Sequence, residues 1–169
     1  MIGTALECIA WLSTQREGTF EVDFHKEKRS LSANSLYWKC VGRIGQAMKE
    51  PNAYVHNFML RQLGIYEIYD GEVARVLLRD TDEVERQTMY DPENHLMPER
   101  GERGLKIING ERYRWYALLK HSSDFDKSEM SRLIDAITEQ MRNMGLVPPQ
   151  DEDIHRAIEL YEKHRKKES

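Results

Sequence analysis

An Asn-Gly pair at residues 109–110 constrains the fold of this chain more than any other feature of its sequence. A two-residue type I′ turn needs a positive φ at both central positions, and Asn-Gly adopts that conformation at little cost. Because β-forming side chains flank the pair on both sides, residues 105–119 predict an antiparallel hairpin. The second strand of this hairpin has three side chains on one face, namely Tyr113, Trp115 and Ala117.

The clearest helical pattern covers Asp126 to Met144. Asp126 followed by Glu129 is typical of a capping box at a helix start. Apolar side chains then repeat with the spacing of a heptad seam: Met130, Ile134, Ile137, Met141 and Met144. This seam predicts either core packing against the hairpin or a two-fold interface in a homodimer. The interface would use the side chains of Met130, Ile134, Ile137 and Met141.

The remaining periodic segments complete an α+β pattern with N-terminal helices, a small antiparallel sheet and two C-terminal helices. Helices are expected at residues 2–12, 33–49, 52–63, 126–144 and 151–166, and strands at 19–24 and 72–79 as well as in the hairpin. Polar residues dominate 80–104, which we expect to form a long excursion, and prolines mark a connector at 146–150. We expect the chain, residues 1–169, to form a single domain.

Composition favours a folded protein, since 40% of the residues are hydrophobic and 32% are charged. No apolar run approaches the roughly 18 residues that a membrane span needs. The first residues lack the positive flank and the cleavage site of a signal peptide. The two cysteines, Cys8 and Cys40, lack metal-binding spacing and are expected to be small buried side chains. Together these features predict a protein of the reducing cytoplasm, with no membrane partner.

Basic residues are concentrated at positions 24–49, although the net charge of the chain is −4. This stretch has six Lys and Arg residues and one acid, Glu27. The first bases precede a predicted helix start, where free backbone N–H groups favour phosphate. Asn34 is suited to hydrogen-bonding a base edge, and Trp38 to stacking on an unpaired base, whereas Tyr37 is expected in the core. The predicted nucleic-acid-binding residues are Lys26, Lys28, Arg29, Asn34, Trp38, Lys39 and Arg43.

The same segment carries a resemblance to a known family. Arg29-Ser30-Leu31, Asn34 and Trp38 match the R-S-L-x-x-N-x-x-x-W signature, so the segment resembles the NinB/Orf recombination proteins of phages. Residues 116–146 are similar to small proteins of Firmicute phages and prophages. The resemblance implies a dimeric, non-enzymatic phage protein that binds single-stranded DNA in the bacterial host and works with single-strand binding protein. It also implies that Arg29, Asn34 and Trp38 contact the DNA.

Two other functions stay open on the sequence. The second half of the chain, residues 65–169, is acidic, which suits an inhibitor that binds a basic host nucleic-acid enzyme, such as an RNA-guided nuclease. The acids between Asp80 and Glu85 would suit a metal-dependent nuclease, although a solvated loop explains them as well. The alternative to any nucleic-acid function is that the basic residues of positions 24–49 are ordinary solvated surface.

No short motif of a familiar enzyme class occurs in the sequence. The chain has no phosphate-binding loop, no dinucleotide glycine fingerprint, no zinc spacing and no nucleophile elbow. The six histidines are scattered and none pairs with another at the spacing of metal ligands. We therefore predict no catalytic residue, no metal site and no cofactor.

Overall fold

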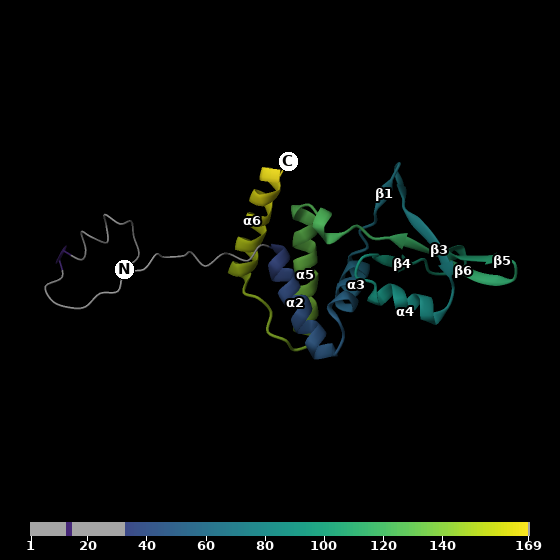
Figure 1. Cartoon of the computed structure of the whole chain (residues 1–169). Helices are drawn as coiled ribbons and strands as arrows, with labels where there is room; N and C mark the ends of the chain where they lie inside the picture. Colours follow the sequence, from purple (N-terminus) through teal and green to yellow (C-terminus); the bar gives the residue numbers. More distant parts are fainter. Residues whose placement is uncertain (1–12, 15–32, 169) are drawn as a thin grey trace. The chain divides into compact units, whose positions relative to one another are not determined.

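The computed structural model describes residues 13–14 and 33–168, and it gives side chains as far as residue 160 (Figure 1). The chain divides into two compact units, Met1–Ser30 and Leu31–Ser169. In the first unit Ser13 and Thr14 are described, and both are helical and exposed. Several predictions lie outside the described residues: the helix at 2–12, the strand at 19–24, and Cys8, Lys26, Lys28 and Arg29.

The second unit is an α+β fold, as predicted. Its elements are the helices α2 (Ala33–Met48), α3 (Asn52–Leu63), α4 (Asp82–Tyr90), α5 (Lys127–Asn143) and α6 (Asp151–Glu168), and the strands β1 (Ile68–Tyr69), β2 (Glu72–Val73), β3 (Arg75–Arg79), β4 (Leu96–Pro98), β5 (Leu105–Ile108) and β6 (Glu111–Leu118). Figure 1 shows α2, α5 and α6 grouped apart from the main sheet, and α3 contacts both α5 and strand β4. None of the helices in the described residues is long and apolar enough to cross a membrane.

Strand β6 is the centre of the main sheet. It pairs with β3 along one edge, and along the other edge with β5 near its start and with β4 near its end, all antiparallel. The predicted hairpin is confirmed, because β5 and β6 meet at Asn109 and Gly110, whose φ angles are 52° and 82°. The predicted strand at 72–79 forms two strands, β2 and β3, separated at Ala74. β2 pairs with β1 and β3 pairs with β6, and the Ala74 backbone N–H donates to the Glu67 carbonyl.

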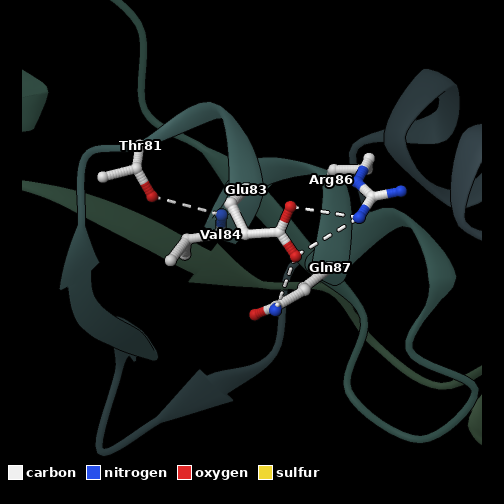
Figure 2. A network of polar contacts seen from close by, with 5 residues as sticks. All are labelled: Thr81, Glu83, Val84, Arg86 and Gln87. Atoms are coloured by element: carbon white, nitrogen blue, oxygen red, sulfur yellow. Dashed lines mark hydrogen bonds and ion pairs between the residues drawn. The ribbon is translucent and has the colours of Figure 1, made fainter.

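Residues 80–104 contain a helix and a strand, α4 and β4, where the sequence had predicted a polar excursion. Local polar contacts support the first turns of α4 (Figure 2). The side chain of Thr81 accepts a hydrogen bond from the Val84 backbone N–H at 3.3 Å. Glu83 accepts hydrogen bonds from Arg86 at 3.0 Å and from Gln87 at 2.9 Å, one helical turn away. Such a helix depends on its cap and its side-chain pairs more than on an apolar stripe.

Helix α2 buries the stripe that its spacing predicts as far as Ile44. Tyr37 is completely buried, and Cys40 is a free buried cysteine. The helix ends at Met48, and the chain reverses toward α3 directly after it. A Cβ at Gly45 would lie 2.8 Å from the Glu50 carbonyl oxygen, so a glycine allows this close approach of the two segments.

The heptad seam of α5 lies in the hydrophobic core. Met130, Ile134, Ile137 and Met141 are at most 1% exposed. They pack within one cluster that includes buried side chains of α2, α3 and α6. This burial favours the core-packing alternative for the seam over a dimer interface through these four residues. A homodimer through another surface stays a prediction.

The capping box at the start of α5 is confirmed and allows a direct test. The Asp126 carboxylate accepts the Glu129 backbone N–H at 2.8 Å, and the Glu129 carboxylate accepts the Asp126 backbone N–H at 2.8 Å. We expect Asp126→Ala to lower the free energy of unfolding by about 1 kcal/mol, because a backbone N–H of the first turn loses its acceptor. Asp124→Ala, an exposed acid two residues earlier, is the matched control and should change stability by less than about 0.5 kcal/mol in urea denaturation. Equal losses in the two variants would contradict the capping role.

Candidate functional site

Trp38 lies in the second turn of α2, at the edge of the buried stripe, and its side chain is 38% exposed. Its indole packs on the imidazole of His56, which belongs to α3. The two ring centroids are 4.8 Å apart and the planes are inclined by 40°. Helix α2 packs against α3, so this contact follows from the helix pairing. The result is a large aromatic side chain that is supported on one side and accessible to solvent.

A row of three histidines continues from this tryptophan. His56 and His95 are 4% and 5% exposed, and His121 is exposed. The ring centroids of His56 and His95 are 4.8 Å apart, and those of His95 and His121 are 4.7 Å apart. His95 directly precedes β4, and His121 follows β6. Helix α3 and two loops therefore place side chains from distant parts of the sequence in one row with Trp38.

Neutral hydrogen-bond partners hold the two buried histidines. The Tyr37 hydroxyl and the His56 Nδ1 share a hydrogen bond of 2.7 Å. The Asn57 amide nitrogen donates to the backbone carbonyls of Met89 at 3.0 Å and Asp91 at 2.7 Å. The Asn57 Oδ1 is therefore an acceptor, and the His95 Nδ1, 2.6 Å away, carries the hydrogen that it accepts. This assignment leaves the Nε2 of neutral His95 as a hydrogen-bond acceptor.

Burial keeps these two histidines uncharged at neutral pH. Burial, together with the neighbouring His95 and His121, lowers the pKa of His56 to about 3. Burial, followed by the charge of His121, lowers the pKa of His95 to about 4. Burial also raises the pKa of the Tyr37 phenol far above its ordinary value. The interior of the row therefore offers stacked rings and polar atoms without positive charge.

The predicted site residues on α2 occupy two adjoining strips of its surface. Asn34 is exposed one helical turn before Trp38, and Lys39 is exposed one turn before Arg43. The Arg43 guanidinium donates through Nη1 to the carbonyl oxygen of Val147 at 2.6 Å, so it also holds the connector before α6. Lys26, Lys28 and Arg29 lie outside the described residues, so their part in the site stays a prediction.

Three of the acidic residues considered for a metal-dependent nuclease are engaged with basic partners or backbone groups. Asp80 forms ion pairs with Arg112 at 2.9 Å and Arg114 at 2.6 Å. Glu83 pairs with Arg86, and the Asp91 carboxylate accepts backbone N–H groups of the following loop. In the part of the chain that the structure describes, no three His, Cys, Asp or Glu side chains converge in a way that would hold a metal ion.

The histidine row was missed at the sequence level because its members are far apart in the chain. No two histidines stand at the spacing of metal ligands in the sequence, so spacing gives no sign of the row. Tertiary packing of α3 with the loops before β4 and after β6 creates the proximity. Trp38 was found because its position next to a basic segment and at the flank of an apolar stripe is a local signal.

Comparison of the chain with protein-family models, with curated protein sequences and with solved structures finds no match.

Proposed function

We propose that this protein binds single-stranded DNA and that Trp38 stacks on an unpaired base. The observation that carries the proposal is the indole of Trp38, which is 38% exposed and backed by the His56 ring at 4.8 Å. An aromatic ring that is held in place and open to solvent is the element on which single-stranded nucleic acids stack, and each stacked base contributes about 1–3 kcal/mol. The energy does not depend strongly on which base is bound.

The surroundings of Trp38 supply polar and basic groups that suit a DNA strand. Asn34 lies one turn before it with an amide that can reach a base edge, and Lys39 is exposed next to it on the helix. Lys26, Lys28 and Arg29 precede α2 in the sequence and would add phosphate contacts. By its resemblance to the NinB/Orf proteins, we place the protein in phage recombination as a non-enzymatic accessory to single-strand binding protein.

Removal of the indole should weaken DNA binding strongly. We expect Trp38→Ala to raise the dissociation constant for a fluorescent single-stranded oligonucleotide by roughly tenfold, because one stacked base is lost. Trp38→Phe keeps a ring on His56 and should retain most of the affinity. Fluorescence polarisation at low salt measures all three proteins, and a duplex of the same sequence should bind more weakly than the single strand.

Tyr69→Ala is the matched control for the loss of an exposed aromatic side chain. Tyr69 is 75% exposed in the turn region of the β1–β2 hairpin, outside the proposed site. Its removal should leave the dissociation constant unchanged. The proposal fails if the wild-type protein does not bind the single strand at low salt, or if Trp38→Ala and Tyr69→Ala bind equally well.

A further inference from the structure

A cavity of about 550 Å³ lies between α3, α4 and the chain that follows β4. It shares no lining residue with the Trp38 row. Part of its wall is apolar and includes Phe58, Met89, Met97 and Pro98. Arg61, Arg100 and Arg114 also line it. A cavity of this volume is of the size that small organic ligands occupy in proteins, and its lining combines an apolar surface with three cations.

Arg61 is the cation that α3 supplies to this cavity. It lies near the end of α3, and it donates through Nε to the Leu96 carbonyl at 2.7 Å and through Nη2 to the Thr88 hydroxyl at 2.8 Å. Within the described residues, no carboxylate lies within 4.0 Å of it and its Nη1 makes no hydrogen bond. Burial lowers the pKa of this guanidinium. The charge of Glu85 partly offsets this effect without a direct ion pair, and a bound anion would offset the desolvation cost of the half-buried cation further.

The other two arginines differ in how they are held. Arg114 donates through Nε to Asp80 at 2.6 Å and through Nη1 to the Glu99 carbonyl at 2.7 Å. Arg100 is exposed and has no hydrogen bond or ion pair with any residue in the described ranges. The backbone before it is closely packed, because a Cβ at Gly104 would lie within 2.4 Å of the Glu99 carbonyl oxygen. The rim of the cavity therefore has a closely packed backbone and carries one unpaired guanidinium, that of Arg100.

Acidic side chains at the cavity only partly oppose these charges. Glu99 forms an ion pair with Arg75 at 2.5 Å, and Arg75 does not line this cavity. The charge of Glu99 is therefore balanced from outside the cavity. Glu85 is exposed at the cavity and makes no ion pair with the residues described. With Arg114 paired to Asp80, the charges left for a ligand are those of Arg61 and Arg100 against Glu85. The balance favours an anion.

We propose that this cavity binds a small organic phosphate of about the size of a nucleoside monophosphate. The phosphate is placed between the guanidinium groups of Arg61 and Arg100, which match its oxygens in geometry and charge. The faces of the ligand's flat base lie on the apolar side chains of Phe58 and Met97. This site is independent of the DNA-binding surface at Trp38, so a failure of one proposal leaves the other standing.

Titration of the full-length protein with thymidine monophosphate, followed by calorimetry, tests the site. Thymidine and inorganic phosphate are the comparison ligands, since each has half of the proposed chemistry. We expect thymidine monophosphate to bind more tightly than either of them. Arg100→Gln removes an exposed side chain without partners, so the fold is retained, and it should weaken binding about fivefold. Glu85→Gln removes the opposing charge and should strengthen binding about threefold.

Arg103→Gln is the matched control, because Arg103 is an exposed arginine three residues from Arg100 that does not line the cavity. It should bind thymidine monophosphate as the wild type does. The proposal is overturned if thymidine monophosphate shows no saturable binding or binds no better than thymidine or inorganic phosphate. It is also overturned if Arg100→Gln and Arg103→Gln have the same affinity.

Discussion

Acidification from pH 7.5 to pH 5.5 is expected to lower the free energy of unfolding of this protein by roughly 3 kcal/mol. The cause is the pair of buried histidines beside Trp38. His56 and His95 have pKa values of about 3 and about 4 in the folded protein, against an ordinary value of about 6.5 in the unfolded chain. Both are neutral in both states above pH 7, so they do not affect stability there.

Below pH 6.5 the unfolded chain takes up two protons that the folded protein does not accept. Stability therefore falls with pH, by up to about 1.4 kcal/mol per pH unit for each of the two histidines. The loss begins near the unfolded pKa and continues until the pH reaches the folded pKa values of His56 and His95. Each histidine that is buried in its neutral state adds to the slope of stability against pH. The size of the slope therefore shows how many such histidines the folded protein contains.

Urea denaturation followed by circular dichroism at a series of pH values measures this slope. We expect His56→Gln to have about half the wild-type slope between pH 6 and pH 5, whatever its stability at pH 7.5. His155→Gln, which removes an exposed histidine of α6, should keep the full slope. A wild-type protein as stable at pH 5.5 as at pH 7.5 would contradict the buried neutral state of the histidine row.

Local signals account for the parts of the fold that the sequence predicted. The hairpin turn depends on two adjacent residues, Asn109 and Gly110, and the start of α5 depends on Asp126 and Glu129. Helix α3 ends where Gly64 adopts the left-handed conformation with φ of 61°. Each of these features is complete within a few residues, so sequence spacing contains the information.

Features that depend on tertiary context could not be predicted in the same way. Helix α4 has an exposed, strongly polar surface, and Thr88 is its buried residue. Its end is held by a side chain of α3, because the Asn57 amide donates hydrogen bonds to the backbone carbonyls of Met89 and Asp91. In the sequence, nothing distinguishes Asn57 from an ordinary polar residue of a helix. Only the folded chain shows that it joins α4 to the histidine row.

The seam of α5 shows a different limit of sequence analysis. A run of apolar residues at heptad spacing is equally suited to the core of one chain and to an interface between two chains. What decides between them is whether other apolar surfaces of the same chain cover the seam. Here α2, α3 and α6 supply that cover, and Ile137 and Met141 are fully buried as a result. The residues of the seam alone do not contain this information.

Truncation in the seam is expected to have the largest effect of any single substitution considered. Ile137→Ala should lower the free energy of unfolding by about 2–5 kcal/mol, because it leaves a cavity at a fully buried position. Ile107→Ala makes the same chemical change at a residue of β5 that is 74% exposed, and should cost less than about 1 kcal/mol.

Urea denaturation at two protein concentrations measures both variants. The loss in Ile137→Ala should be independent of concentration, because the contacts lie within one chain. A loss that diminishes as the protein concentration rises would instead restore a role for this seam between two copies.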